Sequence, residues 1–400
     1  MSVRESLRQA WRGEPPGVTE HASRPAECRS WPGPEIVLGR WPRGGVGALL
    51  DLALASSPRR AGGVQLRRVP SAGGRYPVEA HVVHRGTAWR YDPVRHALAA
   101  PAPSATSTSD IRIVLSLNPV RTWWRYGPRS LPVLLLDLGH ALGALLAAAA
   151  ALGHPARAAT GPGVDVLAEW AGLPHTGGVV RWPGCAPEFP LAVVEIGDVL
   201  TVPLATPAER TPVPEPLLDD IVAAHGEAAW DQLIAALAEF GAGTPEQAWQ
   251  WHGPAPAVPD LLSRVAAPWE AIDPGHVPAG LTSAAAPMAV GRIAMLEVAG
   301  NDLVADLAPR SCGQPEVLGA GALLVATGTV DPDPPTAFAE HLGAGLAVHA
   351  AWLAATGLGL PARPVGCWID TVLRSAAGPA RLLHALAIGG RALIEEDGTT

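Results

Sequence analysis

The 400-residue chain repeats part of itself at an offset of 206 residues, and this repeat restricts the fold more than any other feature. Residues 139–157 align with residues 345–363, and 10 of the 19 aligned positions are identical. Alanine supplies several matches, but the shared ending Leu-Gly-X-Pro-Ala-Arg does not depend on alanine. A strand-like segment precedes each copy, and turns at 70–74 and 282–287 lie further upstream. This common order predicts two related halves fused in tandem.

The composition is that of a globular protein, with 48% hydrophobic and 16% charged residues. The net charge of -8 argues against a nucleic-acid-binding protein, which would normally present a basic face. The four cysteines are widely spaced and form no Cys-X-X-Cys pair, so we expect neither a disulfide framework nor a metal site. The first residues contain no apolar signal core, so we expect a cytoplasmic protein.

Residues 131–153 form an apolar segment that is long enough to span a bilayer. Asp137 and His140 lie inside this segment, where both would be costly in lipid. The segment is apolar almost all round, which is typical of a helix buried in the middle of a protein. We therefore predict a central core helix and no contact with a membrane.

Changes in composition divide the chain into four parts. We predict an irregular N-terminal segment at 1–44, a first domain at 45–200, a Pro-rich linker at 201–216 and a second domain at 217–400. Hydrophobic periodicity predicts alternating helices and strands in both domains. Helices are expected at 46–55, 131–153, 164–171, 217–240 and 341–359, and strands at 78–86, 88–93, 111–117, 191–197, 291–298 and 322–330.

Three segments of the first half resemble one known family. Residues 67–83 (RRVPSAGGRYPVEAHVV), 89–98 and 124–153 are similar to the SagB-type branch of the nitroreductase superfamily. That branch includes the azoline dehydrogenases of thiazole/oxazole-modified peptide biosynthesis. The second half resembles the wider superfamily at 311–328 and 345–368. The resemblance implies an α+β fold and FMN bound between two subunits, so two tandem nitroreductase-like domains would form an intramolecular pseudo-dimer.

The resemblance also indicates which residues would hold the flavin. Small residues let backbone approach a flat ring closely, and glycine permits unusual dihedral angles. Ring atoms need backbone N–H donors, which the family takes from the turn after the long helix. The phosphate needs cations, and arginine suits it through its forked guanidinium. The predicted flavin-binding residues are Ser71, Ala72, Gly73 and Gly74 in the loop, Pro364, Val365 and Gly366 in the turn, and Arg67, Arg68 and Arg391 at the phosphate.

The two predicted flavin sites are not equivalent. In the family, the Pro-Ser loop of one subunit faces the post-helix turn of the other. Residues 70–74 should therefore meet residues 362–366 and Arg391, whereas residues 282–287 would meet residues 155–161 without a C-terminal arginine. We predict one competent and one degenerate site. The superfamily's N-terminal Arg-Arg-Ser phosphate motif is not evident in either half.

The predicted catalytic residues are Tyr126 and Arg125, which stand where azoline dehydrogenases carry a Lys-Tyr pair. Tyr126 can exchange a proton. Arg125 is a poor base because its guanidinium stays protonated, but it can stabilise a developing negative charge.

Three functions follow as hypotheses from the resemblance. The first is an FMN-dependent oxidoreductase that oxidises thiazoline or oxazoline rings, or a related peptide-derived natural product. The second is an NAD(P)H-dependent reductase similar to nitroreductases. The third is a flavin-free pseudoenzyme, acting as a scaffold in a peptide-modifying complex. The expected partners are a peptide or peptide-like substrate, a cyclodehydratase complex and a second copy of the chain.

Overall fold

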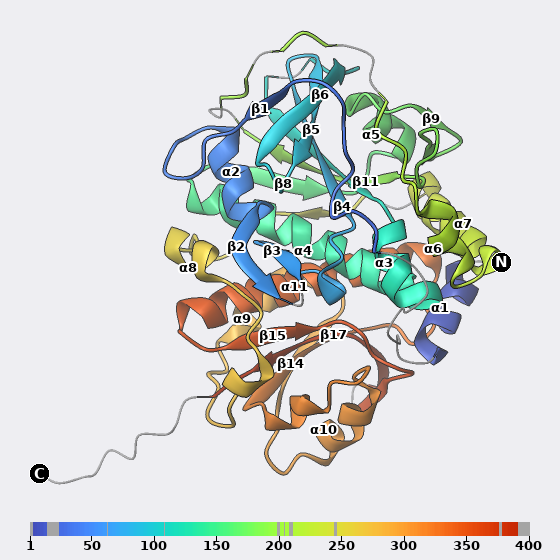
Figure 1. The fold of residues 1–400 in the computed structure, drawn as a ribbon. Coiled ribbons are helices and arrows are strands. Elements are labelled where there is room, and N and C mark those ends of the chain that lie inside the picture. The colour runs from blue at the N-terminus through green and yellow to red at the C-terminus, as the bar shows by residue number, and fades with distance from the viewer. Residues whose placement is uncertain are drawn as a thin grey trace, which may run out of the picture.

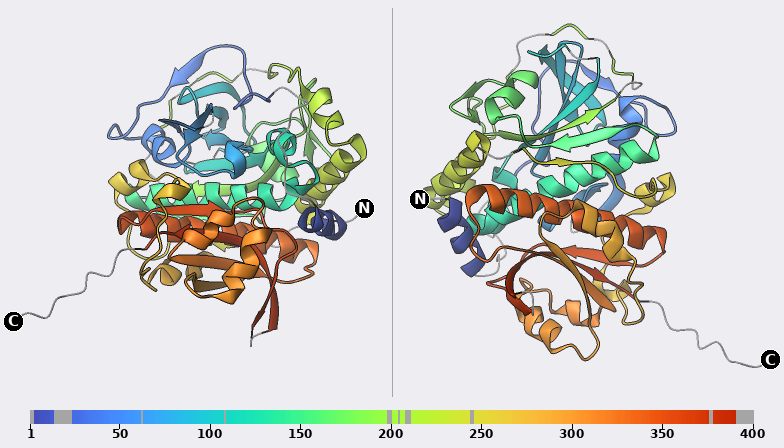
Figure 2. Two further views of the ribbon diagram at one scale, coloured as in Figure 1. Left: turned by 60° about the horizontal axis from the view of Figure 1, so that its bottom comes forward. Right: turned by 180° about the vertical axis from the view of Figure 1, so that it is seen from behind.

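The computed structural model describes residues 3–13, 24–61, 63–107, 109–197, 201–203, 205–207, 211–243, 246–375 and 378–390. Two β-sheets form the outer layers, and two long helices lie side by side between them (Figures 1 and 2). These helices are α4 (Ser130–Ala151) and α11 (Pro334–Gly357), the two copies of the sequence repeat. The fold is therefore α+β, as predicted.

The first sheet contains eight strands in the order β1-β6-β5-β4-β7-β11-β8-β12. Helix α4 follows β7 in the chain and precedes β8, and both of these strands belong to this sheet. The strands are β1 (Glu35–Val37), β4 (Val78–His84), β5 (Thr87–Asp92), β6 (Ala97–Pro103), β7 (Ile111–Leu117), β8 (Ala156–Ala159), β11 (Phe189–Ile196) and β12 (Ala248–Trp249). Around them lie α2 (Val46–Ala53), the hairpin β2 (Ser56–Ala61) and β3 (Val64–Arg67), α3 (Val120–Tyr126), α5 (Val164–Trp170), the short pair β9 (His175–Thr176) and β10 (Val179–Val180), α6 (Leu218–Ala223) and α7 (Glu227–Gly243).

The second sheet repeats the central order of the first. Its strands run β13-β14-β17-β15, with β16 paired to β17, and α11 connects β14 to β15. The segment β4-β7-β11-β8 has the same order, the same long helix after its second strand and the same antiparallel pairing throughout. The bounds are β13 (Arg292–Glu297), β14 (Ala322–Gly328), β15 (Ala362–Val365), β16 (Val372–Ser375), β17 (Gly378–Ile388), α8 (Val258–Ser263), α9 (Leu281–Ala285) and α10 (Asp302–Leu307).

Glycines allow α4 and α11 to pack with their backbones in contact. A Cβ added at Gly139 would overlap the carbonyl oxygen of Leu342, and one added at Gly345 would overlap that of Leu136. These two contacts exchange under the 206-residue offset, so the two helices contribute the same surface to one shared interface.

The membrane-length segment is a core helix, as predicted. By length and composition Val120–Ala151 could cross a bilayer, but 94% of its apolar window is buried inside the protein. Its two polar residues have partners. The Asp137 carboxylate accepts hydrogen bonds from Ser71, and the His140 ring lies between the rings of His349 and His384.

The described part of the N-terminal segment at 1–44, which was predicted to be irregular, contains a helix and a short strand. Helix α1 (Val3–Arg12) packs against α7, and Arg8 forms an ion pair with Asp331 in the second half. The backbone N–H of Asp370 donates to the carbonyl of Trp11. Polar residues dominated the prediction, but the buried face of α1, with Val3, Leu7 and Trp11, finds its partners far along the chain.

The chain changes sheets later than the predicted boundary at 217. The Pro-rich segment 201–216 is anchored to the first half, where the Glu215 carboxylate accepts from Arg29 and from the backbone N–H of Ala186. The predicted helix at 217–240 is two helices, α6 and α7, and β12 then pairs with β8. The second sheet begins only with β13. Helix α11 also starts earlier than predicted, because Asp333 caps it by accepting from the backbone N–H of Thr336.

Candidate functional site

One cavity lies where the predicted loop of the first half faces the predicted turn of the second. The loop runs through the short helical turn η1 (Ala72–Gly74), in which Gly73 has φ +57°, a conformation that favours glycine. The turn follows β15. The lining residues are Pro70, Ser71, Ala72, Gly73, Tyr126, Val133, Leu136, Asp137, His140, Ala266, Gln314, Arg363, Pro364, Gly366, Cys367 and His384.

The cavity brings together six of the predicted site residues: Ser71, Ala72, Gly73, Tyr126, Pro364 and Gly366. Gly74, Val365, Arg125, Arg67 and Arg68 do not line it. Arg391 lies outside the described residues.

The Arg67 side chain is held by contacts within the first half. Its guanidinium donates to the carbonyl of Glu27 and lies 4.7 Å from the ring centroid of Tyr76. Burial against Tyr76 decides where its side chain points, so Arg67 does not line this cavity and its predicted role at the phosphate stays a prediction.

Asp137 is the acidic group of the cavity, and the sequence analysis missed it. It lies on α4, is 4% exposed, and accepts from Ser71 Oγ at 2.6 Å and from the backbone N–H of Ala72 at 3.1 Å. Burial raises the pKa of this carboxyl to about 7, and the hydrogen bonds from Ser71 and Ala72 oppose the rise. A carboxyl that titrates near neutral pH can accept or release a proton. Its position inside an apolar helix is the sequence feature that could have identified it as a functional residue.

Tyr126 stands beside the Gly73 end of the loop. Its hydroxyl oxygen lies 3.2 Å from where a Cβ on Gly73 would be. Burial raises the pKa of the phenol to about 12, and the nearby Asp137 carboxylate adds to the rise. Tyr126 therefore keeps its proton at neutral pH and serves as a hydrogen-bond donor or an acid, not as a base.

A row of three histidines joins both halves, and two of them, His140 and His384, line the cavity. His384 Nδ1 lies 3.0 Å from the carbonyl of Val365, so it donates there and Nε2 accepts. His140 Nε2 then donates to His384 Nε2 at 2.8 Å, and His140 Nδ1 accepts from His349 Nδ1 at 3.4 Å. His349 Nε2 accepts from Arg264 at 3.0 Å.

Only one set of neutral tautomers satisfies this whole row. Burial lowers the pKa of all three rings, and that of His384 falls to about 4. The three uncharged rings therefore hold α4, α11 and β17 in register behind the turn at Gly366.

A disulfide lies beside the cavity, contrary to the prediction from the spacing of the cysteines. Cys312 and Cys367 are paired, with a sequence separation of 55 and Cα atoms 5.7 Å apart. Cys367 lines the cavity directly after Gly366. The pairing depends on the fold, which returns the strand after α11 to the loop before β14. Among the described residues, no group of three or more His, Cys, Asp or Glu could hold a metal ion.

The equivalent turn of the first half is closed by protein. Strand β12 pairs with β8, the counterpart of β15, and the backbone N–H of Thr160 donates to the carbonyl of Gln247. The predicted loop at 282–287 is helical instead, and it packs against α11. The counterpart of Asp137 at the 206-residue offset is Gly343, where an added Cβ would lie 2.6 Å from the backbone nitrogen of Val290.

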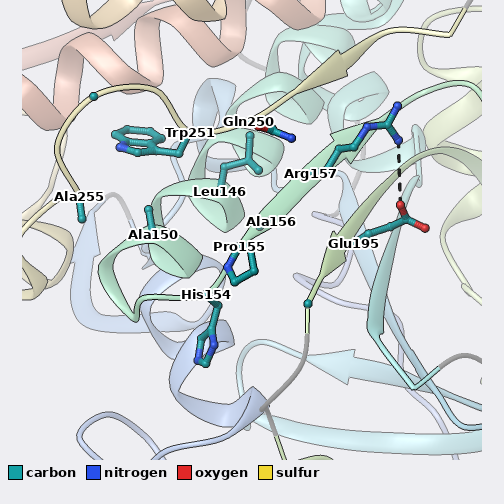
Figure 3. A pocket seen from close by; sticks show the side chains of 12 residues that line it. Leu146, Ala150, His154, Pro155, Ala156, Arg157, Glu195, Gln250, Trp251 and Ala255 are labelled. Carbon is teal, nitrogen blue, oxygen red and sulfur yellow. Dashed lines mark ion pairs between the residues drawn. The ribbon is translucent and has the colours of Figure 1, made fainter.

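A second cavity lies where α4 ends and β8 begins, and residues 158–160 of the closed turn do not line it (Figure 3). Arg157 and Glu195 face each other there, and Trp251 lies over Leu146. Arg157, the counterpart of Arg363, also donates to Glu246 at 2.7 Å. The charge of Arg157 is thus balanced by two carboxylates, whereas Arg363 donates to the backbone carbonyl of Ala267.

Comparison with solved structures identifies the fold. A candidate nitroreductase from Anabaena variabilis matches 98% of this chain and 99% of its own, with a TM-score of 0.64 and 17% sequence identity. The chain has a nitroreductase-like fold. A candidate nitroreductase from Ralstonia eutropha is 21% identical over 47% of this chain and 95% of its own, with a TM-score of 0.31. A chain of the E. coli microcin synthetase McbBCD complex with truncated pro-MccB17 bound is 21% identical over 39% of this chain and 63% of its own, with a TM-score of 0.29. No family model and no curated protein sequence matches the chain.

In a nitroreductase-like fold the expected cofactor is FMN, and the walls of the cavity suit a flat ring. Ser71, Ala72 and Gly73 form one wall, and Gly366 lies on the other. A Cβ at Gly366 would come within 3.3 Å of His384 and 3.4 Å of Leu136, so a side chain there would need these neighbours to shift. The enclosed space is about 140 Å³, and about 660 Å³ when the opening to solvent is included. A flavin ring would lie against these residues, and the rest of the nucleotide would extend through the opening.

Two arginines near the cavity have donors to offer a phosphate. The buried Nε atoms of Arg68 and Arg363 make no hydrogen bond. Arg363 lines the cavity and stacks on Trp269 at 5.1 Å, while Arg68 stands two residues before the lining residue Pro70. Both side chains can therefore donate to a phosphate, the acceptor that arginine binds best. The residues present therefore fit FMN.

Proposed function

We propose that this protein is an FMN-dependent oxidoreductase of the SagB type, acting on a thiazoline or oxazoline ring or a related peptide-derived substrate. The observation that carries the proposal is the cavity in which the loop of Ser71 to Gly73 meets the turn at Gly366, with Asp137 and Tyr126 between them. The azoline substrate class is supported by the resemblance of residues 67–98 and 124–153.

In this proposal FMN supplies a two-electron acceptor for a hydride from the substrate. The loop of Ser71 to Gly73 and the turn at Gly366 hold the ring, and Arg363 and Arg68 hold the phosphate. The histidine row supports the turn from behind and excludes water on that side of the cavity.

Asp137 is the proposed proton acceptor. Loss of a hydride from an azoline ring also requires loss of a proton from a neighbouring atom. Asp137 is the ionisable carboxyl in the cavity, and Ser71 and Ala72 hold its oxygens in place. Tyr126 remains protonated and donates a hydrogen bond to the ring nitrogen or the adjacent carbonyl of the substrate.

We further propose that the two halves are duplicated domains forming a pseudo-dimer with one flavin site. The shared strand order and the reciprocal contacts of Gly139 and Gly345 support the duplication. Strand β12 and Gly343 close the second position. We therefore expect one FMN per chain, measured by absorbance of the released flavin against protein concentration, and a ratio of two would contradict the asymmetry.

Arg363 and Arg157 provide a matched test of where FMN binds. Replacing Arg363 with methionine removes a charge-assisted donor at the cavity, so we expect FMN affinity to fall by about 10- to 100-fold. Replacing Arg157 with methionine removes an ion pair on the other half and should leave affinity unchanged. The measurement is fluorescence titration with FMN, and thermal melting checks that both variants fold.

The outcomes of this titration separate the candidate functions. No FMN uptake by the native chain would refute the flavin function and leave the scaffold hypothesis. FMN bleaching by NAD(P)H, with no loss of two hydrogens from a thiazoline peptide by mass spectrometry, would favour the reductase. Equal losses in the Arg363→Met and Arg157→Met variants would mean that FMN binds elsewhere.

A further inference from the structure

The Cys312–Cys367 disulfide is placed between the cavity and solvent. Cys367 is 7% exposed and lines the cavity. Cys312 is partly exposed and precedes the exposed Gly313, in a loop where Cys312 itself has φ +53°. Non-glycine residues in this conformation are uncommon and cluster at functional sites. One cysteine therefore lines the cavity, and the other lies in a partly exposed loop.

A buried arginine lies against both sulfurs. Arg129 Nη2 is 3.4 Å from Cys312 Sγ and 3.4 Å from Cys367 Sγ. Its other contacts are the carbonyls of Gly13 and Trp368, and its Nε has no hydrogen-bond partner. Arg129 is 5% exposed, and no carboxylate among the described residues forms an ion pair with it.

A buried cation without a counter-ion is costly, so its position calls for an explanation. A disulfide is a weak acceptor and carries no charge. Reduction of the disulfide would create a thiolate at the guanidinium and supply the missing anion. The arrangement is thus better suited to the reduced pair than to a permanent cross-link.

We propose that Cys312 and Cys367 are a redox-active pair that passes two electrons from the flavin to an external disulfide. The inference rests on the proposed function, which generates reduced FMN. In the step, the S–S bond breaks, one sulfur becomes a thiol and the other a thiolate beside Arg129, and the second proton from the reduced flavin is released to solvent. Reduced FMN supplies two electrons and two protons and returns to its oxidised form. A small-molecule or protein disulfide that reaches Cys312 then reoxidises the pair by thiol–disulfide exchange.

Anaerobic dithionite titration of the FMN-loaded full chain tests the electron transfer. The native chain should take up four electrons, two for FMN and two for the pair, because a disulfide is a two-electron couple. The Cys312→Ser and Cys367→Ser variants should each take up two. Absorption of a thiolate beside oxidised flavin at long wavelength should appear in Cys312→Ser, which keeps Cys367, and not in Cys367→Ser. Glutathione disulfide should reoxidise the native reduced chain faster than the Cys367→Ser variant.

Alkylation of the FMN-free chain tests the role of Arg129 independently. After reduction with dithiothreitol, iodoacetamide should label Cys367 and Cys312 near neutral pH. Replacing Arg129 with methionine should raise the thiol pKa by about one unit and slow labelling about 10-fold, and lysine should restore part of the rate. Cys28 is an internal reference, because burial raises its pKa to about 11 and should keep it unlabelled.

The possible failures are distinguishable. An FMN-loaded native chain that takes up two electrons, with Cys312 and Cys367 still paired by mass spectrometry, would make the disulfide structural and overturn the inference alone. Labelling rates unaffected by Arg129→Met would overturn the role of Arg129. A chain that takes up no FMN would refute the proposed function and, with it, the electron transfer.

Discussion

Replacing Asp137 with asparagine is expected to lower turnover of the FMN-loaded chain by about 10²- to 10⁴-fold, the usual contribution of a positioned general base. Asparagine has nearly the same shape and can still accept from the backbone N–H of Ala72, so flavin binding should change little. In the native protein the rate should rise with pH through about 7, because that is where the buried carboxyl loses its proton. The rate of the Asp137→Asn variant should not rise with pH in this range.

The same substitution should make the protein more stable at high pH. The folded carboxyl keeps its proton up to about pH 7, whereas its ordinary pKa is 3.8. Since the folded state binds more protons between these values, the free energy of unfolding falls as the pH rises through this range. At about 1.36 kcal/mol per pKa unit, the full loss is about 4 kcal/mol, of which about 3 kcal/mol falls between pH 5 and pH 8. Chemical denaturation at pH 5 and pH 8 measures this loss of stability. The Asp137→Asn variant should show almost none of this loss.

Ser71→Ala is the matched control for Asp137. Ser71 Oγ donates to the carboxylate and lowers its pKa, so its loss should move the pH profile upward and reduce turnover less than Asp137→Asn does. A rate in Asp137→Asn within a few-fold of the native rate would show that another group takes the proton. A profile in Ser71→Ala that moves to lower pH would contradict the assignment of the titrating group.

Replacing Gly345 with valine is expected to destabilise the fold by at least about 3 kcal/mol. The new Cβ would overlap the carbonyl of Leu136 and lie 3.0 Å from Gly139 Cα, and both are backbone atoms of α4 that side-chain rotation cannot move. Because the contact is reciprocal, Gly139→Val should have a similar effect. Denaturant unfolding measures the change. FMN binding should fall with it, since the cavity has one wall in each half.

Gly357→Ala is the control on the same helix. A Cβ there would meet only the side-chain oxygen of Asp260, at 3.2 Å, and alanine favours a helix more than glycine does. We expect this variant to be neutral or slightly stabilised. A Gly345→Val variant as stable as the native protein would mean that α4 and α11 do not pack at this contact.

Much of the fold could be predicted because its patterns are local. The apolar run around Leu138 identifies α4, alternation identifies β4 and β7, and the repeat identifies α11 as the partner of α4. The resemblance also placed the loop at Ser71 opposite the turn at Gly366. These features depend on residues that are close in sequence or repeated within it.

Only the tertiary structure decided what several side chains do. Asp137 became a cavity acid because Ser71 reaches it from 66 residues away, and His140 meets His384 across 244. Arg67 turned away from the cavity, and the pairing of β12 with β8 closed the second position.

The internal repeat thus determined by itself that the chain has two halves with matching long helices. The resemblance predicted unequal sites, but the sequence could not determine how the second position is closed, because the direction of a side chain and the partner of a strand edge are decided by packing against distant residues. The cysteines illustrate the limit: their spacing argued against pairing, and the return of the chain after α11 brought Cys367 to Cys312.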